Sequence, residues 1–235
     1  MRGLPLFLGV TPNTPLRALG IIAFDTLHAL RRSRPLPRQT ILQVAAFLDF
    51  AGCINAAWDR KALCAAEYRA VRQRLQQAGL ESTIAEYLSR LQAIERWRPS
   101  SGGDYRRFNE IRSYREAVVG LTLATAAAIA LDDESLEDAD MDTLFRILMQ
   151  CQIIDDVLDY DADRSAGLPS FLTAAPSRSE AVALTADASR RYLECGSSPA
   201  CGAWPLRMAL WVASAVARLV VRVADQPMIV RLAGI

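Results

Sequence analysis

A run of aspartates between residues 152 and 163 has the residue types and the spacing that could bind a metal ion. The run reads Gln152-Ile-Ile-Asp-Asp-Val-Leu-Asp-Tyr-Asp-Ala-Asp163, so five carboxylates fall within nine residues. In a helix, Asp155, Asp159 and Asp163 would lie on nearly one line, because residues four apart share a face. Stacked like charges destabilise a helix unless a cation lies between them. Mg²⁺ above all meets this need, because it prefers oxygen ligands, so the run predicts half of a metal–diphosphate site.

The elements that must position these aspartates are helices. Apolar residues recur at helical spacing through long segments that proline and glycine separate, and nothing in the pattern calls for a strand. The pattern predicts helices over residues 16–32, 39–58, 61–78, 82–98, 105–131, 143–163, 179–194 and 205–223. Gly167 and Pro169 should break the aspartate-rich helix. The connecting loops are too short to separate independent domains. We therefore expect a single all-α domain over residues 1–235, an antiparallel bundle of about eight helices.

Composition excludes several classes of protein. A formal charge of +1 gives no overall field that would attract a nucleic acid. The single histidine and five cysteines without zinc spacing argue against a zinc site and for reduced thiols. With 23% charged residues the chain is too polar for a polytopic membrane protein, and Pro5 and Pro12 interrupt the apolar start that a signal peptide would need. We expect a cytoplasmic protein.

The aspartate run and the loop after it resemble the second aspartate-rich region of trans-isoprenyl diphosphate synthases. Gln152-Ile-Ile-Asp-Asp-Val-Leu-Asp159 is followed by Gly167-Leu-Pro-Ser-Phe-Leu-Thr173. The wider resemblance is to class I isoprenoid synthases, which include terpene cyclases and the squalene and phytoene synthases. It implies an isoprenoid synthase-like helical bundle, Mg²⁺ as cofactor and prenyl diphosphates as substrates. It also implies that Asp155, Asp156 and Asp159 ligate the metal and that Gln152 contributes to substrate binding.

The chemistry of such enzymes asks for two further features. Mg²⁺ and arginine neutralise the diphosphate leaving group, so that the allylic C–O bond can ionise in an apolar, water-poor cavity. A second acidic cluster must face the first, and the full family motif for it is absent. The nearest candidates are Asn55 and Asp59, which share a helix face and could bind one ion through an amide and a carboxylate oxygen. Alternatively, Asp59 is a surface residue beside Arg60 and Asn55 helps to end the helix.

Two groups of arginines are candidates for binding the diphosphate. Arg112 and Arg115 open the most apolar helix, and their placement resembles that of the arginine in terpene cyclases that senses the diphosphate. A guanidinium is planar and permanently charged, which suits phosphate. A solvated charged turn with neighbouring glutamates is the alternative. Arg191 and Tyr192 could cap the diphosphate once the site closes, although the pattern favours a plain helix surface.

The sequence thus predicts a Mg²⁺-dependent, terpene synthase-like lyase that ionises an allylic prenyl diphosphate, with cyclisation or loss of diphosphate. One alternative is a prenyltransferase that elongates the chain with isopentenyl diphosphate, although the basic motif for a second diphosphate is not visible. Another is a non-catalytic homologue that binds prenyl lipids. The arginines between residues 31 and 38 are compatible with a peripheral membrane contact. The apolar faces of the second and fifth predicted helices are compatible with a homodimer.

Overall fold

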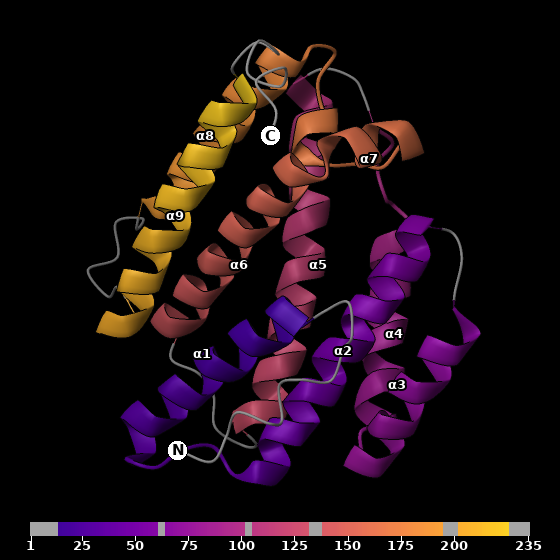
Figure 1. Ribbon diagram of the computed structural model, residues 1–235, viewed down its shortest axis with the longest axis vertical. Helices are drawn as coiled ribbons and strands as arrows, with labels where there is room; N and C mark the ends of the chain where they lie inside the picture. Colours follow the sequence, from indigo (N-terminus) through magenta and orange to yellow (C-terminus); the bar gives the residue numbers. More distant parts are fainter. Residues whose placement is uncertain (1–13, 61–63, 102–104, 132–137, 195–201, 226–235) are drawn as a thin grey trace, which may run out of the picture. The chain divides into compact units, whose positions relative to one another are not determined.

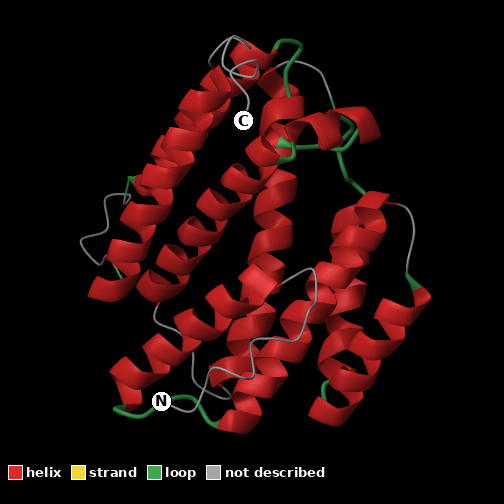
Figure 2. Ribbon diagram, in the orientation of Figure 1, coloured by secondary structure: helices red, strands yellow, loops and turns green. Residues whose placement is uncertain are grey.

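The computed structural model describes residues 14–60, 64–101, 105–131, 138–194 and 202–225. Every regular element in these ranges is helical (Figure 2), which confirms the all-α prediction. This part of the chain contains nine α-helices and one short 3₁₀ helix. In chain order they are α1 (Thr14–Arg32), α2 (Arg38–Arg60), α3 (Ala65–Ala78), α4 (Glu81–Glu95), α5 (Tyr105–Leu131), α6 (Asp138–Leu158), α7 (Tyr160–Ala166), η2 (Phe171–Thr173), α8 (Arg178–Leu193) and α9 (Trp204–Asp225).

The chain divides into two compact units. The first unit comprises the described residues up to Gln92 together with residues 121–131, and the second comprises Ala93–Gly120 and the described residues from 138 onwards. Helix α5 therefore contributes its first part to the second unit and its last part to the first unit. The expectation of a single domain stays a prediction.

The first unit is built around a buried carboxylate on α2. Asp49 is almost fully buried, and its Oδ2 accepts hydrogen bonds from Arg17 of α1 at 3.1 Å and from Arg74 of α3 at 2.7 Å. A buried charge is tolerated only when it is paired in this way. Helices α1 and α2 also approach closely at Gly20, where a Cβ atom would collide with a methyl carbon of Leu48.

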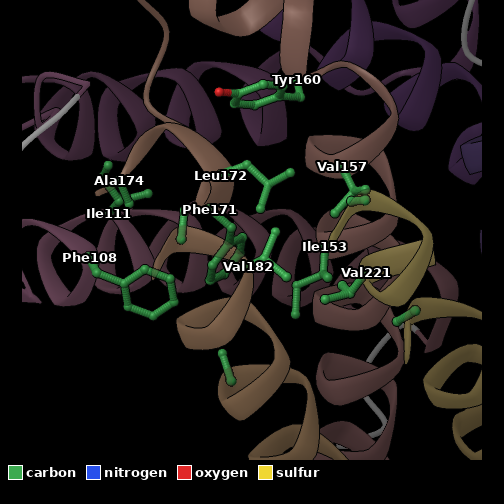
Figure 3. Packing of buried hydrophobic residues seen from close by; sticks show 14 of the residues in the cluster. Phe108, Ile111, Ile153, Val157, Tyr160, Phe171, Leu172, Ala174, Val182 and Val221 are labelled. Atoms are coloured by element: carbon green, nitrogen blue, oxygen red, sulfur yellow. The ribbon is translucent and has the colours of Figure 1, made fainter. Parts of the chain in front are cut away.

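The second unit has one continuous apolar core. Phe108 and Ile111 of α5, Ile153 and Val157 of α6, and Phe171 of η2 meet in it (Figure 3). Helices α8 and α9 complete the core with small side chains, among them Ala181, Ala188 and Ala217. The rings of Phe108 and Phe171 lie 5.7 Å apart, so the turn after α7 is anchored directly to the start of α5.

The aspartate-rich segment differs from its prediction. We expected one helix over residues 143–163, but α6 ends at Leu158 and a new helix, α7, leaves it at an angle (Figure 1). Asp159 lies between them with φ −92° and ψ 9° and serves as the N-cap of α7. Gly167 ends α7 in the left-handed conformation, with φ 67°, which confirms the predicted break at this glycine. The aspartates therefore do not form one straight helical stripe.

Two helices are long and apolar enough to span a membrane when judged by length and composition alone. These segments are Arg38–Trp58 of α2 and Arg106–Leu131 of α5. Core helices of soluble proteins meet the same criterion, so the test is weak for either helix. The sequence argues for a core helix at residues 117–131, and Leu121, Leu123 and Leu131 are indeed buried.

Candidate functional site

Asp156 is the central residue of the aspartate-rich segment. Its side chain is 2% exposed, and three donors surround it. Oδ1 accepts hydrogen bonds from Arg115 Nη2 at 3.0 Å and from Gln152 Nε2 at 2.6 Å, and Oδ2 accepts one from the backbone N–H of Phe171 at 2.7 Å. One carboxylate thus connects α5, α6 and η2 inside the second unit.

The turn that meets Asp156 is folded by its own residues. Ser170 and Thr173 form a capping box in which the Ser170 N–H donates to Thr173 Oγ1 at 2.8 Å. The Thr173 hydroxyl in turn donates to the Leu168 carbonyl at 2.7 Å. With Phe171 buried in the core, these bonds aim its N–H at Asp156. The Gly-Leu-Pro-Ser-Phe-Leu-Thr segment therefore has a clear local role, namely to complete the hydrogen bonding of a buried carboxylate.

The other aspartates of the motif lie nearer to solvent. Asp155 and Asp159 are exposed, whereas Asp163 is partly buried. Burial above all, and then the charge of Asp156, raise the pKa of Asp163 from 3.8 to about 6. Asp159 adds to this rise, while Ser170 and Arg115 oppose it. The spacing placed Asp163 on the same face as Asp155 and Asp159, whereas the family resemblance does not include it among the metal ligands.

Arg112 and Arg115 occupy different environments on α5. Arg115 is mostly buried and forms an ion pair with Asp156. Arg112 lies 3.8 Å from Glu116, whose Oε1 also accepts a hydrogen bond from Tyr192 of α8 at 2.7 Å. Burial, followed by this bond to Glu116, raises the pKa of the Tyr192 hydroxyl. Arg112, Glu116 and Tyr192 thus form a second polar contact between α5 and α8.

Arg191 does not share this environment. It is exposed and pairs with Asp187 at 2.8 Å on the surface of α8. Its neighbour Tyr192 points inward to Glu116. The predicted pair of capping residues is therefore divided between the surface and the interior, as adjacent residues of a helix usually are.

Asn55 and Asp59 belong to α2 in the first unit, whereas Asp155 and Asp159 belong to the second unit. Asn55 is exposed, and the side chain of Asp59 lies outside the described residues. That these residues face the aspartate-rich segment stays a prediction.

The donor set accommodates a Mg²⁺ ion only in part. Among the described residues, no group of three or more His, Cys, Asp or Glu side chains is arranged to hold a metal ion. The two oxygens of Asp156 already accept three hydrogen bonds, so a metal would compete with Arg115, Gln152 and Phe171. Asp155 and Asp159 suit the ion better, because Mg²⁺ often takes one or two exposed carboxylates and completes its shell with water and substrate phosphates.

Comparison of the chain with protein-family models, with curated proteins and with solved structures found no significant match. The resemblance to isoprenoid synthases therefore depends on the motif and its setting.

Proposed function

We propose that the protein is a Mg²⁺-dependent, class I isoprenoid synthase-like enzyme that ionises an allylic prenyl diphosphate, with cyclisation or loss of diphosphate. The observation that supports this proposal best is that the aspartates of the motif occupy two different environments. Asp156 is held by Gln152, Arg115 and the Phe171 N–H, while Asp155 and Asp159 remain exposed at the end of the same helix. A buried carboxylate thus fixes the helix end that displays two potential metal ligands.

In this proposal the chain's own residues bind and orient the diphosphate. Mg²⁺, when bound, would neutralise the leaving group, and Asp155 and Asp159 would hold it. Arg115 sits beside Asp156 at a fixed distance, so its position is set before any substrate binds. Arg112 lies one turn of α5 away and would add a second guanidinium. Gln152 orients Asp156 through its short hydrogen bond and acts as a positioning residue.

The test measures pyrophosphate release from geranyl, farnesyl and geranylgeranyl diphosphates in the presence of Mg²⁺. Asp155→Asn and Asp159→Asn should each lower the rate more than about 100-fold, because even outer-shell partners of a metal ligand contribute 10–100-fold. Asp142→Asn is the matched control, since Asp142 is an exposed aspartate of the same helix that pairs with Arg146. Addition of isopentenyl diphosphate separates chain elongation from the other outcomes. If no pyrophosphate is released from any of these substrates, the proposal of an enzyme is refuted.

A non-catalytic homologue is the second candidate, and one observation favours it. Asp156, Arg115 and Gln152 all have partners inside the second unit, so these residues have a structural use without metal. Such a protein would bind a prenyl diphosphate or prenyl lipid and release no pyrophosphate. Retention of a radiolabelled farnesyl diphosphate without turnover would distinguish it from the enzyme.

A further inference from the structure

A small basic cavity lies where α7, η2 and the start of α8 meet. Its volume is about 320 Å³, and its lining includes Tyr160 and Arg164 of α7, Leu172 and Thr173 of η2, and Arg178 of α8. No carboxylate lines it among the described residues. Two guanidinium groups thus share a concave site without an acidic partner, which distinguishes it from the paired arginines elsewhere in the second unit.

Both arginines converge on one tyrosine. The guanidinium carbon of Arg178 lies 4.9 Å from the centre of the Tyr160 ring, and that of Arg164 lies 6.0 Å from it. Arg164 Nη1 donates a hydrogen bond to the Tyr160 hydroxyl at 3.1 Å. Since this hydroxyl accepts from Arg164, its own proton is available for another acceptor. Nε of Arg178 is buried and has no hydrogen-bond partner in the described part of the chain.

The positive charge of this cavity favours the binding of an anion. Two positive charges near one ring repel each other, and cation–π attraction to Tyr160 compensates only in part. Arg178 is also the first residue of α8, a helix of 16 residues, so the partial positive charge of the helix start adds to the field. A buried, unpaired guanidinium N–H is costly unless a ligand satisfies it.

We propose that this cavity binds a phosphate-class anion, either inorganic phosphate or the phosphate group of a larger molecule. Arg164 and Arg178 would bind its oxygens through their N–H groups, and the Tyr160 hydroxyl would donate to it. This site lies beside the aspartate-rich segment, because Tyr160 and Arg164 directly follow Asp159 and Asp163 in α7. It requires no metal and does not depend on the proposed function.

The test uses the full chain in EDTA at constant ionic strength, so that magnesium plays no part. Titration calorimetry with inorganic phosphate, pyrophosphate and geranyl diphosphate separates a free anion from the headgroup of a larger molecule. Arg164→Gln and Arg178→Gln should each raise the Kd at least about tenfold, because each removes a charge-assisted hydrogen bond. Arg72→Gln, a change at an exposed arginine of α3, should leave the Kd unchanged.

Arginine Nε–H signals in nuclear magnetic resonance spectra give an independent readout. Saturation with phosphate should shift the Arg164 and Arg178 signals, while arginines outside the cavity keep theirs. Arg164 is exposed, so its variant tests the site even if Arg178→Gln fails to fold. Equal affinity in the wild type and in Arg164→Gln, or no binding of any of the three anions, would overturn the proposal. Because magnesium is absent, neither result bears on pyrophosphate release.

The outer face of α9 carries a second inference from a separate observation. One face of α9 exposes large apolar side chains, while Leu206, Leu210 and Val221, together with small residues such as Ser214 and Ala217, face the interior of the second unit. The exposed set is Trp204, Met208, Trp211, Val212, Val216, Leu219 and Val223. At 100° per residue these residues form one continuous arc. Arg207 and Arg218 lie along one of its edges, and Arg222 lies just inside that edge.

We infer that this face docks onto an anionic lipid surface. An apolar arc with tryptophans and a basic edge is the pattern of helices that lie in the membrane interface. Helix α9 has no acidic residue before Asp225, so an antiparallel pair of α9 helices from two copies would bring arginines together without a carboxylate between them. Charge complementarity therefore favours anionic lipid over a second copy.

Sedimentation with vesicles of phosphatidylcholine, with and without phosphatidylglycerol, tests this inference. Trp204→Ala combined with Trp211→Ala should lower partitioning at least about tenfold on anionic vesicles. Replacing the three arginines with glutamine should abolish the preference for phosphatidylglycerol. Trp97→Ala, a change at an exposed tryptophan outside α9, is the matched control. Absence of vesicle binding would overturn the inference, as would a dimer that the double tryptophan variant converts to monomer without any effect on vesicle binding.

Discussion

Replacing Asp156 with alanine should destabilise the protein even when no metal is present. The change removes the acceptor for Arg115, Gln152 and the Phe171 N–H at once. The Arg115 guanidinium would stay in a pocket where its side chain is only 11% exposed, without its carboxylate. The Phe171 N–H would stay buried behind the ring that packs against Phe108.

The expected cost follows from these lost partners. Removal of one member of a buried ion pair costs about 3–5 kcal/mol, because the remaining charge is uncompensated. The unpaired Arg115 guanidinium accounts for most of this range, and the two lost neutral donors do not add to it in full. We therefore expect the free energy of unfolding to fall by about 4 kcal/mol. Since Arg115 bears most of this cost, combining Asp156→Ala with Arg115→Met should cost less than the sum of the two single changes. We expect a coupling of about 1–3 kcal/mol.

Urea unfolding in EDTA, followed by circular dichroism and tryptophan fluorescence, measures this cost. With a slope of about 2 kcal/mol per molar urea, the midpoint of the second unit should fall by about 2 M. Asp142→Asn is the control, and its exposed ion pair with Arg146 should contribute about 1 kcal/mol or less. If Asp156 served only as a metal ligand, its removal without metal would relieve repulsion from neighbouring aspartates and raise the midpoint. A neutral or stabilising effect of Asp156→Ala would therefore refute the structural role.

Three further changes test other contacts. Asp163 has a pKa of about 6 in the folded protein against 3.8 ordinarily, so its ionisation opposes folding and stability falls as pH rises from about 4 to 6. Asp163→Asn should therefore stabilise the protein at pH 7 by about 1 kcal/mol, after a discount for partial exposure, and should have no such effect near pH 4 in thermal unfolding. Tyr192→Phe removes the hydrogen bond to Glu116 and should cost about 1–2 kcal/mol in urea unfolding; an unchanged midpoint would contradict the contact. Gly20→Ala would place a methyl group against the end of the buried Leu48 side chain; displacing that side chain costs about 1–3 kcal/mol, and the higher helix propensity of alanine offsets about 1 kcal/mol of it. We expect a net loss of up to about 2 kcal/mol in urea unfolding, and a stabilising effect would mean that Leu48 moves aside without cost.

The fold class and most helix bounds were predictable, because periodicity and breakers are local signals. Helix α5 matches its prediction at both ends, and Gly167 ends α7 as expected. The division of the aspartate segment at Asp159 was not predictable from periodicity. Tyr160, the first residue after the break, is buried in the apolar core of the second unit. This tertiary packing outweighs the continuous helical pattern.

The candidate site was only partly visible in the sequence. Spacing identified the aspartates and Arg115 but could not show that Arg115 and Asp156 bind each other, because their 41-residue separation is closed only by packing of α5 on α6. Nor could it show that Glu116 is the partner of Tyr192, 76 residues away. The sequence shows the type of each residue directly. The partner of a charged side chain is set by tertiary packing, and it decides whether that side chain is free to bind a ligand.

The break at Asp159 also explains how one short helix can serve two kinds of site. Asp159 caps the start of α7 and Asp163 lies one turn further on, where the charges of Asp156 and Asp159 act on it. Tyr160 and Arg164 have the same spacing, one residue further on, and line the basic cavity with Arg178. Acidic and basic stripes therefore run side by side along α7. A diphosphate with a divalent cation carries both signs of charge, and a helix with both stripes could meet them from adjacent faces. If the phosphate test succeeds and pyrophosphate release fails, the basic stripe alone is functional, and the aspartates serve mainly to hold Asp156 and its partners in place.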